Sequence, residues 1–298
     1  MDGFLNILKP PGMSSGDVVF QVRRLLPRGT RVGHGGTLDP DAAGVLPVCV
    51  GRAARLFDYI IDKQKTYIAE LRLGIVTDTQ DASGAVLERH DASGVTEEDV
   101  RAVLPQFTGA IEQVPPMYSA LKRGGQKLYD LARRGESLEL APRPVTIHAL
   151  EYIGRRDETA HLLRIVCGKG TYIRTLCHDI GAALGVGGHM AFLLRSAAGC
   201  FDVQAAVTIE ELKAASDEGR LESLLYPLDA PLGHMAALRL GAEWEKQVVN
   251  GVPVRMKGAR FAPGEIVRVY LEDRFAGMGQ ADETGLIRMK AMLLERNA

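Results

Sequence analysis

The segment that decides the fold reads Gly33-His34-Gly35-Gly36-Thr37-Leu38-Asp39-Pro40. Its glycines permit backbone conformations that are closed to other residues, and Pro40 biases Asp39 away from the helical region. Such a turn holds a carboxylate close to a ligand, with little side-chain bulk around it. Asp39 is therefore our candidate for the reacting group. The alternative is that Asp39 forms an Asx-turn or caps the next segment.

The composition is that of an ordinary globular protein, because 46% of the 298 residues are hydrophobic and 24% are charged. This length suits one large domain or two unequal ones. No apolar run approaches the roughly 20 residues that span a bilayer, and the N-terminus does not resemble a secretory signal, so we expect a cytoplasmic protein without membrane contact. The cysteines form no CxxC pair, which predicts reduced, mostly buried thiols and no zinc site. They are Cys49, Cys167, Cys177 and Cys200.

Charge is distributed unevenly along the chain, although the formal net charge is only -1. Residues 75–119 contain eight acids and two bases, whereas residues 119–174 contain eleven bases and six acids. This asymmetry suits a protein with one face that binds nucleic acid, and a solvated charged surface is the alternative.

Hydrophobic spacing predicts a mixture of strands and helices on both sides of the turn. A strand over 4–8 is followed by a helix that begins at Ser14 or Ser15. Residues 45–50 form an apolar run typical of a buried strand, residues 52–61 have helical spacing, and residues 67–73 alternate as a half-buried strand does.

The rest of the chain continues this mixture and ends in a β-rich region. Residues 161–167 predict a strand, and the apolar spacing after Gly170 predicts a helix with Arg174 at its beginning. Thr96 and Thr208 each open a helix, the second with a Thr-x-x-Glu capping arrangement. From a change in composition near 227–233 we predict a large domain over 1–230 and a small one over 231–298. The small domain has strand-like runs at 266–271, 275–281 and 286–292.

Common nucleotide and metal signatures are missing from the sequence. It contains no GxxxxGK[ST], no GxGxxG and no metal-binding pair of histidines. One loop carboxylate without a paired second acid fits nucleophilic or covalent catalysis better than two-carboxylate glycoside hydrolysis.

Further motifs follow one another in a fixed order. They are Lys9-Pro10-Pro11-Gly12-Met13-Ser14-Ser15, the turn with its continuation Asp41-Ala42-Ala43-Gly44-Val45-Leu46-Pro47, Lys65-Thr66-Tyr67, Pro115-Pro116-Met117-Tyr118-Ser119-Ala120-Leu121-Lys122, and Gly170-Thr171-Tyr172-Ile173-Arg174-Thr175-Leu176. In this order they resemble the TruB-type bacterial tRNA pseudouridine(55) synthases, over about residues 3–200. The resemblance implies an α+β fold in which helices flank a central mixed, largely antiparallel sheet. The C-terminal region is read as a PUA-like RNA-binding domain from its position and β-rich pattern alone.

The resemblance also implies the reaction, which is isomerisation of uridine to pseudouridine at position 55 in the T-arm loop of tRNA. The base flips out, the C1′–N1 bond breaks, the uracil turns and a C1′–C5 bond forms, with no cofactor and no metal. Asp39 would be the essential catalyst, whether it attacks C1′, adds to the base or abstracts a proton. Two alternatives are a non-catalytic tRNA-binding or RNA-chaperone protein, and a nucleoside-cleaving hydrolase.

Two further side chains take roles in the reaction by resemblance. Arg174 would pair with Asp39, keep it charged in a site emptied of water and help fill the space left by the flipped base. Its alternative is a phosphate contact or a surface ion pair. Tyr67 would stack on the uracil ring, unless it is plain core.

Three more residues would surround the target nucleotide. His34 would help to move the base out of the loop stack, unless it makes only a local turn hydrogen bond. Tyr172 and Leu193 would line the uridine pocket, although both are core residues by default.

A basic insertion over about 117–143 would close over the T arm of a tRNA bound by a monomeric protein. Its candidate RNA contacts are Lys122, Arg123, Lys127, Arg133 and Arg134. Asp41 departs from the family pattern, where an apolar residue is more usual, and its carboxylate is expected to raise the pKa of Asp39 unless it points to solvent.

Overall fold

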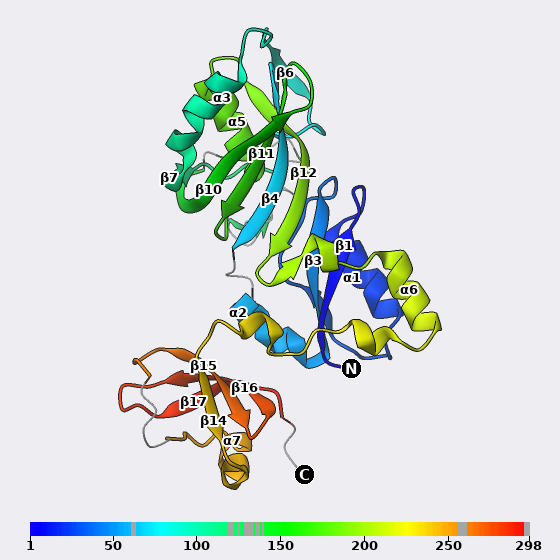
Figure 1. Cartoon of the computed structure of the whole chain (residues 1–298), viewed down its shortest axis with the longest axis vertical. Helices are drawn as coiled ribbons and strands as arrows, with labels where there is room; N and C mark the ends of the chain where they lie inside the picture. Colours follow the sequence, from blue (N-terminus) through cyan, green and yellow to red (C-terminus); the bar gives the residue numbers. More distant parts are fainter. Residues whose placement is uncertain are drawn as a thin grey trace.

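The computed structural model describes residues 1–60, 64–118, 122–123, 126–127, 134, 138, 140–255 and 261–294. Its largest sheet consists of β1 (Gly3–Lys9), β2 (Val32–His34), β3 (Ala43–Val50), β4 (Lys65–Leu73), β7 (Gly109–Gln113), β10 (Arg143–Arg155), β11 (Ala160–Cys167), β12 (Gly188–Ala198) and β13 (Phe201–Asp202). The strand order is β1-β3-β12-β4-β11-β10-β7, with β2 beside β3 and β13 beside β12 (Figure 1).

This sheet confirms the predicted fold class. The β3–β12 pair is parallel, and the other described pairs of the sheet are antiparallel. Two small hairpins stand apart from it, and they are β5 (Ile75–Thr77) with β6 (Val86–Arg89) and β8 (Lys122–Arg123) with β9 (Gln126–Lys127).

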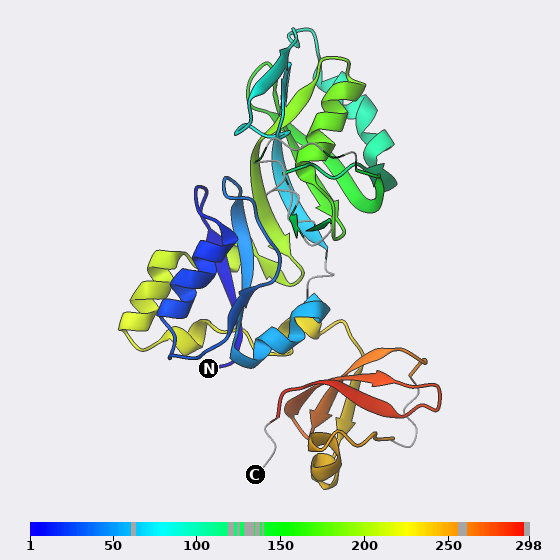
Figure 2. The same cartoon turned by 180° about the vertical axis from the view of Figure 1, so that it is seen from behind.

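Helices cover both halves of the sheet, as Figures 1 and 2 show from opposite sides. The α-helices of this part are α1 (Ser15–Arg24), α2 (Phe57–Ile60), α3 (Glu97–Val103), α5 (Ile173–Ala183) and α6 (Ile209–Asp217). Helix α1 begins where a capping box predicts, because the Asp17 N–H donates to Ser14 Oγ (3.1 Å) and the Ser14 N–H donates to the Asp17 carboxylate (3.0 Å). Its buried face carries Val18, Val19 and Val22.

The helical spacing predicted over 52–61 corresponds to two short helical elements and not to one regular α-helix. The segment is a 3₁₀ helix, η1 (Gly51–Leu56), followed by the single turn of α2, and residues 61–63 lie outside the described ranges. Apolar spacing over so few turns does not separate windings of 3.0 and 3.6 residues per turn.

The two halves of the large sheet meet at a short parallel junction. Strands β3 and β12 pair there through Leu194 opposite Ala43 and Arg195 opposite Gly44. Gly44 has a φ of +116°, and a Cβ at this position would lie 2.2 Å from the carbonyl oxygen of Arg195. The halves can therefore approach this closely only because residue 44 has no side chain.

We expect Gly44→Ala to destabilise the protein by about 3 kcal/mol or more, since the substitution combines a steric clash with a left-handed backbone. Gly154→Ala is the matched control, because a Cβ at Gly154 in β10 meets nothing within 4 Å. Urea unfolding measures both variants. Equal midpoints for the two variants would contradict the close approach at the junction.

A second sheet forms the C-terminal end of the chain, below η1 and α2 in Figure 1. It has the order β14 (Ala237–Leu240), β15 (Ile266–Leu271), β16 (Arg274–Ala281) and β17 (Ile287–Met292), and α7 (Glu245–Val249) lies between its first two strands in sequence. The three predicted strand-like runs are confirmed, whereas β14 was not predicted.

The end of this second sheet is fixed to η1 by two arginines. Arg52 Nη1 donates to the Leu293 carbonyl oxygen (2.6 Å), and Arg55 Nη1 donates to that of Met292 (2.5 Å). Leu293 and Met278 also share an apolar cluster with Phe4 of β1. Within the described part of the chain, no helix is both long and apolar enough to cross a membrane.

Candidate active site

A cleft of about 930 Å³ opens where the two halves of the large sheet meet. One wall comes from the start of α1 and the loop at 37–42, and the other comes from β12, the start of α5 and the loop at 79–83. Six predicted residues line it, and they are His34, Asp39, Tyr67, Tyr172, Arg174 and Leu193. Segments far apart in the sequence thus converge on one site.

The loop that carries Asp39 is fastened to the loop after β1. Lys9 is fully buried, and its Nζ donates to the carbonyl oxygens of Pro10 (2.8 Å), Met13 (2.5 Å) and Pro40 (2.8 Å). Burial lowers the pKa of Lys9 to about 8. The Leu38 N–H donates to Ser15 Oγ (2.9 Å), which donates back to the Leu38 carbonyl oxygen (3.0 Å). The residues on both sides of Asp39 are therefore held.

Arg174 reaches Asp39 from the first turn of α5. Its Nε lies 3.1 Å from Asp39 Oδ2, and its Nη2 donates to the Tyr118 carbonyl oxygen (2.8 Å). The Arg174 side chain is only 7% exposed, whereas that of Asp39 is 42% exposed and faces the cleft. The pair thus presents its carboxylate to a ligand while the guanidinium stays behind it.

Asp81 is a second carboxylate on Arg174 that the sequence did not point to. Its Oδ2 lies 3.6 Å from Arg174 Nη1, and its Oδ1 accepts from Thr79 Oγ1 (2.6 Å) and from Ser83 N–H (3.0 Å) and Oγ (2.6 Å). It follows the β4–β5 region, far in sequence from both partners, so only the pairing of β-strands brings it here. A lone acid in a polar loop gives no signal for such a contact.

Burial and the surrounding charges set the pKa of Asp39 in opposite directions. Burial is the largest effect and raises the pKa, the Arg174 guanidinium lowers it, and the carboxylate of Asp81 raises it again. The pKa of Asp39 lies above the ordinary aspartate value as a result. Asp41 is exposed and its raising effect comes last among the causes, so the predicted coupling exists in the expected direction but is minor.

We expect Asp81→Asn to move the acid limb of the pH–rate profile to lower pH, because it removes a charge that raises the pKa of Asp39. The rate at neutral pH should fall on the order of tenfold to a hundredfold, since Arg174 loses one of the groups that orient it. Asp41→Asn is the control, with a smaller shift and no loss of rate. A profile of Asp81→Asn that superimposes on that of the parent would contradict this coupling.

Tyr67 and His34 lie on neighbouring walls of the cleft. Tyr67 is half-buried in β4 and packs against the apolar cluster of the second half of the sheet, and burial raises the pKa of its hydroxyl. His34 ends β2, with the Nδ1 of its ring buried and without a hydrogen-bond partner among the described residues. Burial and the nearby Arg195 charge lower the pKa of His34, while a hydrogen bond to the Gly36 backbone acts against them.

Tyr172 is half-buried and lines the cleft, whereas Leu193 belongs to the core and to the cleft at once. Tyr172 is the N-cap residue of α5, and its backbone is held by the side-chain amide of Gln113, which accepts from the Tyr172 N–H (3.0 Å) and donates to its carbonyl oxygen (3.2 Å). Leu193 is 6% exposed in β12 and packs in the same cluster as Ile173.

Of the five predicted basic contacts, Arg133 lies outside the described ranges. The backbones of Lys122, Arg123 and Lys127 belong to the β8–β9 hairpin, and Arg134 is exposed.

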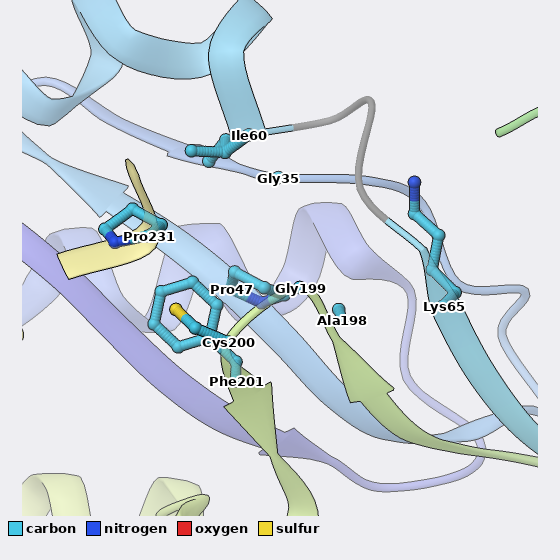
Figure 3. A pocket seen from close by; sticks show the side chains of 9 residues that line it. All are labelled: Gly35, Pro47, Ile60, Lys65, Ala198, Gly199, Cys200, Phe201 and Pro231. Carbon is cyan, nitrogen blue, oxygen red and sulfur yellow. The ribbon is translucent and has the colours of Figure 1, made fainter. Parts of the chain in front are cut away.

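A second hollow, of about 10 Å³, lies between α2, the turn after β12 and the segment before the second sheet (Figure 3). Ile60, Cys200 and Pro231 line it, and it holds no more than about one water molecule. It is too small for a nucleotide, and no member of the Asp39–Arg174–Asp81 group lines it.

Comparisons with known proteins are consistent across the whole chain. Residues 23–173 match the family described as TruB family pseudouridylate synthase (N terminal domain), residues 174–233 match the tRNA pseudouridylate synthase B C-terminal domain, and residues 236–293 match pseudouridine synthase II TruB, C-terminal. A tRNA pseudouridine synthase B of Alkaliphilus oremlandii is 47% identical over 94% of this chain and 93% of its own length. A tRNA pseudouridine synthase B of Clostridium perfringens is 41% identical over 99% of this chain and 100% of its own length.

Solved structures agree with this match. The crystal structure of an archaeal box H/ACA sRNP Nop10-Cbf5 complex contains a chain that is 26% identical, with a TM-score of 0.74 over 99% of this chain and 87% of that one. The crystal structure of a Cbf5-Nop10-Gar1 complex contains a chain that is 27% identical, with a TM-score of 0.73 over 99% of this chain and 84% of that one.

Proposed function

We propose that this chain, which belongs to the TruB family of pseudouridylate synthases, isomerises uridine to pseudouridine at position 55 in the T-arm loop of tRNA. The observation that carries the proposal is the pair formed by the partly exposed Asp39 carboxylate and the buried Arg174 guanidinium in the cleft. An acid placed in this way can act on C1′ or on the base of a nucleotide that enters the cleft.

The ionised carboxylate of Asp39 performs the chemistry in this proposal. The C1′–N1 bond breaks, the uracil turns in the pocket, and the C1′–C5 bond forms as C5 loses its hydrogen. Arg174 favours the charged form of Asp39 and acts against burial, which favours the neutral form.

The walls of the cleft suit a flipped base. Tyr67 supplies an aromatic face from β4, and Leu193 supplies an apolar surface from the adjacent strand β12. His34 has a lowered pKa and is therefore uncharged at neutral pH, so it can hydrogen-bond a nucleotide at the entrance without adding charge. A volume of about 930 Å³ exceeds what one nucleobase needs, which fits the entry of part of an RNA loop.

The basic insertion is our proposed clamp on the T arm. We expect Lys127→Glu combined with Arg133→Glu to weaken tRNA binding and to flatten its salt dependence. Each phosphate contact that is lost reduces the number of counterions released on binding. Lys213→Glu combined with Arg220→Glu is the matched control, since both residues are exposed on or after α6. Filter binding at several salt concentrations measures both pairs. Identical affinities for the two double variants would mean that the insertion does not contact the tRNA.

The proposal extends to the other parts of the chain. The C-terminal sheet, in a domain over 231–298, would add RNA contacts as a PUA-like domain does, and a single copy of the protein would act on each tRNA in the cytoplasm. Sedimentation experiments with and without tRNA test the single copy. The protein should have the mass of one chain when it is alone, and the mass of one chain plus one tRNA in the complex.

Analysis of the nucleosides from treated tRNA tests the function directly. We expect pseudouridine at position 55 and the matching loss of uridine. Unchanged uridine in tRNA that is nevertheless bound would favour the RNA-binding or chaperone role. Free uracil in the supernatant would favour a hydrolase.

A further inference from the structure

Arg195 is a buried cation at the centre of the molecule. It is 1% exposed and belongs to β12, where its Cα partners are Gly44 on β3 and Tyr67 on β4. In the described ranges, no carboxylate oxygen lies within salt-bridge distance of its guanidinium, although Arg174 and Arg52 both have acid partners. Burying a charge without an acid partner costs free energy unless neutral polar groups hydrogen-bond to it. The groups that accept hydrogen bonds from Arg195 therefore indicate its role.

Those contacts are backbone carbonyls at both ends of the Asp39 loop. Arg195 Nη2 donates to the Gly36 carbonyl oxygen (3.2 Å) and Nη1 to that of Thr37 (3.3 Å), before Asp39 in the chain. Its Nε donates to the carbonyl oxygen of Val45 (2.7 Å), where the loop has become strand β3. One planar side chain thus joins the entry and the exit of the loop, which a lysine with its single nitrogen cannot reproduce.

Arg195 also lies beside the other half of the sheet. It pairs with Tyr67 between β12 and β4, and its charge lowers the pKa of the Tyr67 hydroxyl against the larger effect of burial. Arg195 therefore contacts the backbone of the loop that carries the acid, on one half of the sheet, and the aromatic residue of the cleft on the other half.

We propose that Arg195 is a positioning residue for uridine isomerisation, because it holds the Asp39 loop at a fixed distance from Tyr67. This inference rests on the proposed function. Arg195 acts through backbone carbonyls, and it is not among the four charges with the largest effects on the pKa of Asp39. It differs in this from Arg174, which contacts the carboxylate itself.

Three variants test the proposal. Arg195→Met keeps the volume and removes both the charge and the planar guanidinium, whereas Arg195→Lys keeps the charge alone. Arg164→Met is a control on β11, two strands away from β12 in the sheet, where the side chain is 42% exposed. We measure the single-turnover rate at saturating tRNA, tRNA affinity, the acid limb of the pH–rate profile, and amide hydrogen exchange over residues 36–45.

We expect Arg195→Met to lower the rate by about a hundredfold, with tRNA affinity within about threefold of the parent value, because the acid is misplaced and the RNA surface is intact. Arg195→Lys should recover part of this loss. Exchange over 36–45 should rise in both variants, while the acid limb stays where it is in the parent. The control should match the parent in every measurement.

Parent-like rates in a folded Arg195→Met, or a loss of rate without faster exchange in the loop, would overturn the proposal. If Arg195→Met does not fold, Arg195→Lys carries the same comparison. If the parent itself forms no pseudouridine, the proposed function fails, and the exchange measurement still decides whether Arg195 holds the loop.

Discussion

Asp39→Asn is expected to abolish pseudouridine formation while leaving tRNA affinity within about twofold of the parent value. An amide has the size of the carboxylate but cannot act as a nucleophile or base, so every variant of the mechanism that begins with an ionised acid is lost. The contacts that hold the loop come from Lys9, Ser15, Arg195 and backbone groups, and none of these contacts uses the Asp39 side chain.

The stability of this variant provides an independent check. Because the pKa of Asp39 is raised in the folded protein, its ionised form is disfavoured by folding at any pH above that pKa. Removing the charge should therefore leave the thermal midpoint at neutral pH unchanged or slightly higher. Single-turnover assays measure the rate of pseudouridine formation, filter binding measures the tRNA affinity, and thermal unfolding measures the midpoint. Residual activity near that of Asp41→Asn would mean that Asp39 is only a turn residue.

Arg174→Lys is expected to lower the rate by at least about a hundredfold, although the charge is conserved. The arginine uses Nε for Asp39, Nη2 for the Tyr118 carbonyl and Nη1 for Asp81, and one ammonium group cannot occupy three such directions. Affinity for tRNA should change little, because the side chain is 7% exposed and points at the acid.

The pH dependence of the Arg174 variants follows from the same contacts. Activity requires the ionised carboxylate, so it is lost as the pH falls through the pKa of Asp39. Arg174 is the largest effect that lowers this pKa. Arg174→Met should therefore move the acid limb to higher pH, by more than Arg174→Lys does. An acid limb that is the same in the parent and in Arg174→Met would contradict the electrostatic role of the pair.

The Asp39 loop and the position of Arg174 at the start of a helix could be predicted because local sequence carries them. The glycines around Asp39, the proline after it and the helix that begins near Arg174 are all local signals. Their convergence was implied by resemblance to a family, not by periodicity. The α+β class was implied by the same resemblance. Alternation or a continuous apolar run predicted the strands β1, β3, β4, β11, β15, β16 and β17.

The residues that were missed depend on contacts between distant segments. Strand β12 is paired on both sides at the junction, so its apolar residues do not alternate, and its central role could not be predicted. Arg195 looks like any surface arginine in the sequence, because its burial depends on three carbonyls from another part of the chain. Asp81 is placed by the pairing of its segment with Met190, which no local pattern indicates.

The measurement that tests the central claim most directly is tritium release from tRNA labelled at uridine C5. The carbon that becomes glycosidic must lose its hydrogen, so the parent should release tritium equivalent to one uridine per tRNA. This release should disappear when the uridine at position 55 is replaced by cytidine, and it should be absent for Asp39→Asn. No release by the parent from tRNA that it still binds would contradict the assignment of Asp39 as the catalyst of uridine isomerisation.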